Sequence, residues 1–210
     1  NGYMKPQDIE KRSFEIITAE LGERTFPAGI AEVVKRVIHT TADFDYADSL
    51  AFSPDVIEQA KAALAAGATV VTDTNMALSG VSKVTLAKLG GKAVCLMADE
   101  QVASEAKARG VTRAVVSMEH AAKFEGQLIF AIGNAPTALI RLHELIEEGI
   151  VAPALVIGVP VGFVNVVEAK ELFIGGDTPY IIARGRKGGS NVAASIVNAL
   201  LYQLVHREGF

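Results

Sequence analysis

The stretch QLIFAIGNAPTALIRLHELIEEG, residues 127–149, contains the unit from which the architecture follows. Its first six residues form a short apolar run, which predicts a buried strand over residues 127–132. From Asn134 to Gly149, apolar residues recur at helical spacing and a glycine ends the pattern, which predicts a helix. A buried strand that passes through a glycine-containing turn into an amphipathic helix is typical of a parallel sheet.

The same alternation continues on both sides of this unit. Further strands are expected over residues 50–52, 68–72, 92–97, 112–118, 154–159 and 180–184. Further helices are expected over residues 53–67, 82–91, 99–110, 119–126, 165–176 and 190–208, with two more over 5–21 and 27–39. The predicted fold class is therefore α/β. It is a doubly wound, mostly parallel sheet with helices on both faces and two additional N-terminal helices.

Composition restricts the class of protein. The chain has 210 residues, half of them hydrophobic, which suits a single domain, expected over residues 4–210. Residues 1–3 precede Met4 and are expected to be a remnant of expression. A net charge of −4 without a basic surplus gives no reason to expect a nucleic-acid partner. The single cysteine, Cys95, excludes a disulfide framework and fits the cytoplasm, the expected location.

One uncharged run approaches the length of a membrane span. It covers residues 150–167, IVAPALVIGVPVGFVNVV. Because it contains two prolines and two glycines and is dominated by β-branched residues, a buried strand followed by a glycine-rich loop is the preferred interpretation. The N-terminal residues show no signal-peptide pattern, and no membrane partner is expected.

Four loops that follow predicted strands are rich in glycine, asparagine or hydroxyl residues. They cover residues 72–80, 132–137, 158–165 and 184–191. In an open parallel sheet the ligand lies beyond the carboxyl ends of the strands, and free N–H groups at a helix start favour an anion. Ordinary turns also use these residue types. The hypothesis is a wide ligand with several carboxylates or phosphates, whose candidate contacts are Thr72, Asn75, Gly133, Asn134 and Arg186.

Motifs for nucleotide binding are absent. The segment RGRKGGSN, residues 184–191, lacks the spacing of a P-loop, and no GxGxxG follows a predicted strand. A nucleotide or dinucleotide cofactor is therefore not supported by any motif.

Among the four histidines, His39 has the most informative surroundings. It ends a predicted helix, and Arg36 lies one turn before it on the same face. The cation would lower the pKa of His39, whereas Asp43 or Asp45 would raise it, and in either case the ring could titrate in the range useful for proton transfer. Simple capping of the helix C-terminus explains the histidine equally well.

A metal site is the other interpretation of this region. His39 with Asp43, Asp45 and Asp48 would supply ligands for a metal-dependent hydrolase. Their spacing matches no compact metal motif, and a solvated acidic loop is the simpler interpretation, so no metal is predicted.

Six blocks resemble the precorrin-8X methylmutase family of cobalamin biosynthesis, in order and over nearly the whole chain from Met4. They are KRSFEII, RVIHTTADFDYADSLAFS, VVTDTNMALSGV, AIGNAPTALIRLHELI, PALVIGVPVGFVNVVEAKE and RGRKGGSNVAASIVNALL. The resemblance implies an α/β homodimer without a cofactor. It implies an isomerisation in which a methyl group migrates from C-11 to C-12 of the corrinoid ring of precorrin-8X, giving hydrogenobyrinate. The cobalt-containing counterpart, cobalt-precorrin-8, would give cobyrinate.

The resemblance also assigns three residues. The family's histidine, a proton donor and acceptor, matches His39, and its substrate-binding serine and arginine match Ser13 and Arg36. Both N-terminal helices would then flank the pocket. A proton or hydrogen bond delivered to a ring nitrogen would favour the rearranging tautomer without a metal or a nucleophile. The ring's carboxylate arms would suit Arg36 and the four loops, and its apolar surface would rest on Met76, Val161 and Phe163.

A corrinoid-binding carrier without turnover is the alternative that uses the same features. The absorption spectrum separates the two hypotheses, because a carrier would shift it reversibly whereas an enzyme would convert the substrate.

Overall fold

The computed structural model describes residues 3–210 and confirms the predicted α/β class. The expected expression remnant is described only at Tyr3, since residues 1 and 2 lie outside the described part. One six-stranded sheet has the order β1-β6-β5-β4-β2-β3. Its strands are β1 (Leu50–Phe52), β2 (Thr69–Thr72), β3 (Lys92–Cys95), β4 (Leu128–Ile132), β5 (Leu155–Gly158) and β6 (Tyr180–Ala183). All neighbours pair in parallel except β1, which lies antiparallel to β6 at one edge.

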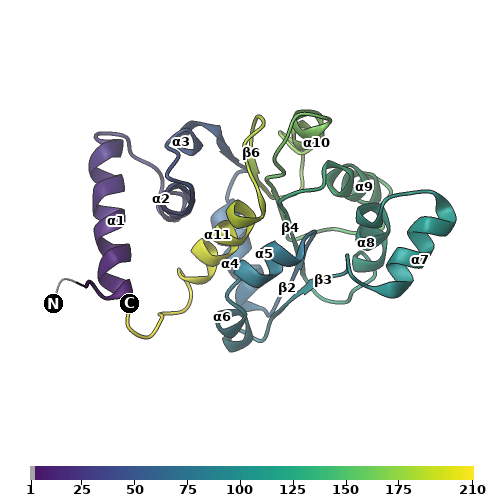
Figure 1. Ribbon diagram of the computed structural model, residues 1–210, viewed down its shortest axis with the longest axis horizontal. Coiled ribbons are helices and arrows are strands. Elements are labelled where there is room, and N and C mark those ends of the chain that lie inside the picture. The colour runs from purple at the N-terminus through teal and green to yellow at the C-terminus, as the bar shows by residue number, and fades with distance from the viewer. Residues whose placement is uncertain (1–2) are drawn as a thin grey trace.

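Helices cover both faces of this sheet (Figure 1). One face carries α4 (Val56–Ala65), α5 (Asn75–Gly80), α6 (Lys83–Lys88) and α11 (Ser190–Leu201). The other carries α8 (Arg113–Ala121), α9 (Pro136–Glu147) and α10 (Val166–Glu171), and α7 (Glu100–Arg109) packs on the outside of α8. Strand β4 contributes to the core on both sides, because Ile129 and Ala131 pack toward α11 while Phe130 and Ile132 pack toward α8 and α9.

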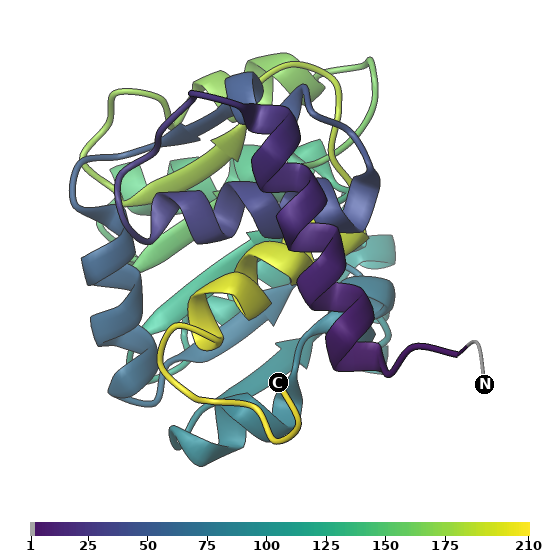
Figure 2. The same cartoon turned by 90° about the vertical axis from the view of Figure 1, so that its left-hand side faces the viewer.

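The N-terminal helices form additional layers outside α11. Helix α2 (Ile30–Thr41) packs on α11, and α1 (Pro6–Leu21) packs on α2. The short α3 (Tyr46–Ser49) then leads into β1. Figure 2 shows α1 crossing in front of α2 on the outside of the molecule. The two additional N-terminal helices are therefore confirmed, and α1 is the element farthest from the sheet.

The predicted strand over residues 112–118 is wrong, because these residues begin helix α8. The run of β-branched residues in TRAVVSM favoured a strand. In the structure the Thr112 hydroxyl accepts a hydrogen bond from the N–H of Val115 and caps the helix. Ala114, Met118 and Ala121 then share one buried face. Helical spacing of the buried side chains thus outweighs the local β preference.

Two further boundaries differ from the prediction. Residues 75–80, expected in a loop, form helix α5, which the Thr74 side chain caps. Helix α11 ends at Leu201 rather than at residue 208, and the following residues form a C-terminal tail that returns toward α1. The separate helix predicted over residues 119–126 is also wrong, because residues 119–121 are the last residues of α8 and the chain then turns toward β4. The other predicted elements are present, several of them shorter than expected.

The uncharged run over residues 150–167 contains β5 and the loop that follows it, as predicted. Within residues 3–210, no helix combines the length and apolar character needed to cross a membrane.

Candidate active site around His39

The structure brings Ser13 and His39 together. Helix α2 buries Val33, Val34, Val37 and Ile38, so the next residue, His39, emerges at the edge of this face, toward α1. There the Ser13 Oγ lies 2.7 Å from His39 Nδ1, a hydrogen bond between residues 26 positions apart. The pair that the family resemblance implied is thus formed by two helices that pack against each other.

This hydrogen bond determines which imidazole nitrogen can act on a ligand. Nδ1 is occupied by Ser13, whereas Nε2 has no hydrogen-bond partner among residues 3–210. Burial lowers the pKa of His39, the nearby Arg36 cation lowers it further, and Glu10 opposes them. A ring that is neutral near pH 7 can donate from Nε2 when Ser13 donates to Nδ1, and can accept at Nε2 in the other tautomer.

A cavity of about 630 Å³ opens beside the pair between α1, α2 and the segment after α2. This volume is in the usual range for small-molecule sites. Apolar side chains dominate the lining, with polar groups at only a few positions. The lining residues are Met4, Ile9, Arg12, Ser13, Ile16, Ile17, Glu20, Ile38, His39, Ala42 and Phe44.

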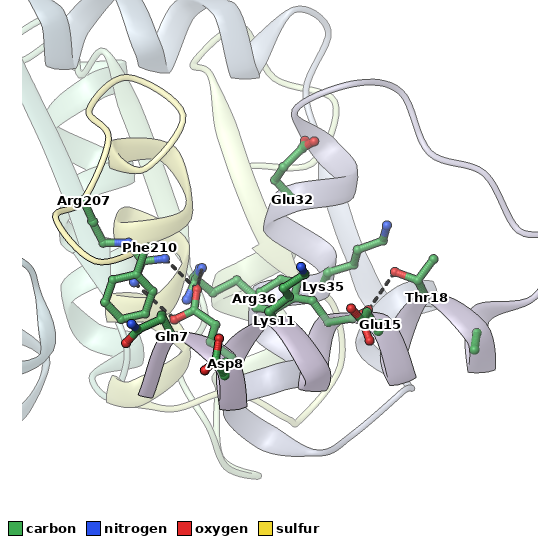
Figure 3. A pocket seen from close by; sticks show the side chains of 13 residues that line it. Gln7, Asp8, Lys11, Glu15, Thr18, Glu32, Lys35, Arg36, Arg207 and Phe210 are labelled. Atoms are coloured by element: carbon green, nitrogen blue, oxygen red, sulfur yellow. Dashed lines mark hydrogen bonds and ion pairs between the residues drawn. The ribbon is translucent and has the colours of Figure 1, made fainter. Parts of the chain in front are cut away.

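Arg36 faces a different cavity, contrary to the expectation that it would share one pocket with Ser13 and His39. It lines a space of about 950 Å³ between α1, α2 and the tail (Figure 3), and the α1 residues that line this space differ from those that line the His39 cavity. Its Nη2 donates to the Glu10 carboxylate at 2.7 Å, and Arg207 of the tail donates to the same carboxylate at 2.6 Å. Burial raises the pKa of Glu10, but hydrogen bonds from Arg207 and Arg36 outweigh it and bring the pKa to about 2.

The four loops meet at the carboxyl edge of the sheet, but their N–H groups are not all free. The buried Asp73 carboxylate accepts hydrogen bonds from the N–H groups of Gly133, Asn134 and Ala135, at 2.8, 2.9 and 2.6 Å. The N–H groups expected to bind an external anion therefore already bind an internal one. Sequence reasoning missed Asp73, because its position within TDTN gave no sign of a partner sixty residues away.

The predicted loop contacts separate into buried and exposed residues. The Thr72 side chain is buried and donates to the carbonyl of Thr74 at 3.0 Å. At Gly133 a Cβ atom would lie 2.7 Å from the Cα of Ser190, so the glycine permits close packing of two loops. Asn75, Asn134 and Arg186 are exposed.

The acidic segment after His39 is joined to the sheet edge by salt bridges. Lys187, in the loop between β6 and α11, contacts the carboxylates of Asp43 at 2.6 Å and Asp45 at 2.7 Å. Asp48 pairs separately with Arg24. In the described part of the chain, no three His, Cys, Asp or Glu side chains gather as a metal site would require. The acidic segment is thus a connection between the His39 end of α2 and the loops.

Lys170 is a second buried residue that sequence reasoning missed. Its ammonium group donates to the carbonyls of Gly185 at 2.7 Å and Lys187 at 3.0 Å, inside the loop that carries Arg186. Burial lowers the pKa of Lys170 to about 8. A lysine in a short amphipathic helix gives no sequence signal that distinguishes it from a solvated one.

Comparisons with known proteins agree on one family. A family model described as precorrin-8X methylmutase matches residues 8–203. A cobalt-precorrin-8 methylmutase of Salmonella typhimurium is 47% identical over 208 residues, covering 95% of this chain and 96% of that protein. A precorrin-8X methylmutase of Pseudomonas aeruginosa is 40% identical, covering 92% and 94%. A solved structure of the precorrin-8X methylmutase from Thermus thermophilus superposes with a TM-score of 0.86 at 39% identity, covering 93% and 94%.

Proposed function

Because this chain belongs to the precorrin-8X methylmutase family, it is a methyl-shifting isomerase of cobalamin biosynthesis, and we propose that His39 transfers the proton that assists the shift. The substrate is a corrinoid, precorrin-8X or its cobalt-containing form, and the methyl group moves from C-11 to C-12. The observation that carries the assignment of His39 is its hydrogen bond to Ser13 beside an apolar cavity.

The proposed chemistry needs one hydrogen, delivered by His39 to one nitrogen of the macrocycle. The neutral ring, with Ser13 donating to Nδ1, gives a hydrogen bond from Nε2 to a nitrogen of the macrocycle, whereas the protonated ring donates from Nδ1 to the Ser13 hydroxyl and transfers its Nε2 proton, which leaves a neutral imidazole. This draws electron density through the conjugated ring and favours the tautomer in which the methyl group migrates. The proton then returns to His39, so the reaction is an isomerisation with no net exchange. The apolar lining keeps water away and strengthens the hydrogen bond.

Binding of the acidic arms is proposed for residues at the rims. Arg36 would keep its Nη2 hydrogen bond to Glu10 and take a carboxylate through its other N–H groups, and the exposed Asn75, Asn134 and Arg186 would contact arms that reach the sheet edge. Ser13 would contact the ring beside His39. For Thr72 and Gly133 we propose a supporting role beneath the loops. The Thr72 side chain is buried, and the backbone at Gly133 packs directly against Ser190.

The test compares His39→Ala with the parent enzyme on both precorrin-8X and cobalt-precorrin-8, followed by absorption spectroscopy. The expected result is a fall in turnover of about 10²- to 10⁴-fold, typical of a lost general acid–base, with binding of the ring largely retained. His120→Ala is the control, since His120 pairs with Glu105 on the opposite side of the sheet. Turnover of His39→Ala at the parent rate would contradict the proton-transfer role. A reversible spectral shift without conversion by the parent protein would indicate a carrier.

We also propose that the chain forms a homodimer and works in the cytoplasm. Support for the dimer comes from two large apolar side chains left exposed in the loop after β5, Phe163 and Val164. Support for the location comes from Cys95, which is a free thiol.

A further inference from the structure

We propose that a column of stacked side chains, running from the C-terminal tail through Arg207, Tyr202, Arg36 and Phe14, is a positioning device for the His39 ring. This inference rests on the proposed role of His39 in proton transfer. Arg207, Tyr202 and Phe14 are positioning residues, because they act through His39, and Arg36 combines this role with its proposed contact to the substrate.

The contacts are continuous from one end to the other. The Arg207 Cζ lies 3.9 Å from the ring centroid of Tyr202. The Arg36 Cζ lies 5.0 Å from the Tyr202 centroid and 5.0 Å from that of Phe14. The Phe14 and His39 ring centroids are 5.3 Å apart, with the planes tilted by 32°. Each cation–ring distance is within the range in which the attraction is significant.

Glu10 makes this column possible. Two guanidinium groups over one aromatic ring would repel each other, and the Glu10 carboxylate accepts hydrogen bonds from both, at 2.7 Å from Arg36 and 2.6 Å from Arg207. All three side chains are largely buried, with 15%, 23% and 18% exposed for Arg36, Arg207 and Glu10. Figure 3 shows Arg36 and Arg207 converging beside α1, with Phe210 lying next to Arg207. The cluster therefore joins α1, α2 and the tail at one point.

The consequence for His39 is that two neighbouring residues of α1 constrain its ring. Ser13 holds Nδ1 through a hydrogen bond, and the tilted ring of Phe14 packs beside the imidazole, with the centroids 5.3 Å apart. With Nδ1 bound by Ser13 and the ring packed beside Phe14, the Nε2 atom of His39 is held pointing in one direction. Phe14 is itself held by Arg36, whose position depends on Glu10 and Tyr202. The C-terminal tail thus supports the orientation of an imidazole more than 160 residues earlier in the chain.

The charged surroundings of His39 are defined by few elements. Helix α11, on which α2 packs, contributes no charged residue. Of the aspartates that follow α2, Asp43 and Asp45 pair with Lys187, and Asp48 pairs with Arg24. The charged side chains that line the two cavities beside the ring come from α1, α2 and the tail: Asp8, Glu10, Lys11, Arg12, Glu15 and Glu20 of α1, Glu32, Lys35 and Arg36 of α2, and Arg207 of the tail.

The first experiment compares Tyr202→Leu with Tyr202→Phe in the full chain. The leucine variant removes the ring that both arginines contact, whereas the phenylalanine variant keeps it. We expect kcat to fall about tenfold in Tyr202→Leu with KM nearly unchanged, because misplacing a catalytic group lowers kcat selectively. We expect Tyr202→Phe to restore the parent value. Equal kcat in all three proteins would overturn the proposal.

The second experiment needs no turnover, so it can fail independently of the proposed function. The titration of His39 is followed by NMR of its imidazole in the parent, Glu10→Gln and Glu15→Gln proteins, with the signal assigned by its loss in His39→Gln. Burial and Arg36 lower the pKa of His39 and Glu10 raises it, so Glu10→Gln is expected to shift the midpoint to lower pH. Glu15→Gln, on the same helix and paired with Arg12, is expected to leave it unchanged. An unchanged midpoint in Glu10→Gln would contradict the proposal.

Discussion

Asp73 is the single residue on which the carboxyl edge of the sheet depends most directly. It is 1% exposed and accepts three backbone N–H hydrogen bonds from the turn between β4 and α9. A charged acceptor shared by three donors is strongly stabilising, and removing it leaves buried N–H groups without a partner.

Asp73→Asn is expected to lower the free energy of unfolding by about 3 kcal/mol, because the amide NH₂ cannot accept and faces backbone donors. Urea denaturation measures the change. Asp48→Asn is the matched control, since its carboxylate is exposed and paired with Arg24, and its expected effect is under about 1 kcal/mol. Equal stability of the two variants would show that the three N–H groups find other partners.

Between elements, the end of β4 and the start of α11 approach so closely that a side chain cannot fit. A Cβ atom at Gly133 would lie 2.7 Å from the Cα and 2.9 Å from the N of Ser190. Because these are backbone atoms, the loop before α11 would have to move. Gly133→Ala is expected to destabilise the protein by about 2 kcal/mol, measured by thermal unfolding. Gly176→Ala, where the nearest atom would be 3.4 Å away, serves as the control and is expected to leave the stability nearly unchanged.

The attachment of α1 to the rest of the molecule is expected to weaken in acid. Glu10 has a pKa of about 2 in the folded protein against 4.5 as the ordinary value, since hydrogen bonds from Arg207 and Arg36 outweigh burial. A carboxyl group whose pKa is lower in the folded than in the unfolded protein stabilises the folded state at pH values above its unfolded pKa. This stabilisation is lost as the pH falls through the folded-state pKa. The parent protein is therefore expected to lose about 3 kcal/mol of stability relative to Glu10→Gln between pH 5 and pH 2, as measured by denaturant unfolding at each pH. A constant difference between the two proteins would contradict this assignment.

For the molecule as a whole, the proposed dimer predicts a mass twice that of the 22.1 kDa chain. Sedimentation velocity at micromolar concentration checks it. A species of single-chain mass would contradict the proposal and leave the exposed Phe163 and Val164 without a partner surface.

Much of the architecture could be predicted, because the signals are local. The apolar run and helical spacing within residues 127–149 predicted β4 and α9, and the same reasoning gave the parallel sheet and both N-terminal helices. The prediction was wrong for residues 112–118, where β-branched residues suit a strand but the spacing of Ala114, Met118 and Ala121 buries a helical face. The β preference of individual residues is a weak predictor where the same residues also fit helical spacing.

The sequence by itself established the α/β alternation, and its resemblance to one family directed attention to Ser13, Arg36 and His39. It could not establish that Arg36 binds Glu10 and faces a second cavity, that Asp73 occupies the N–H groups of a distant turn, or that the tail reaches α1. Strands and helices can be predicted because apolar residues recur at a fixed spacing along the chain. Contacts between positions 10, 36 and 207, or 73 and 134, have no such repeat, because they arise only when the packed layers bring remote segments together.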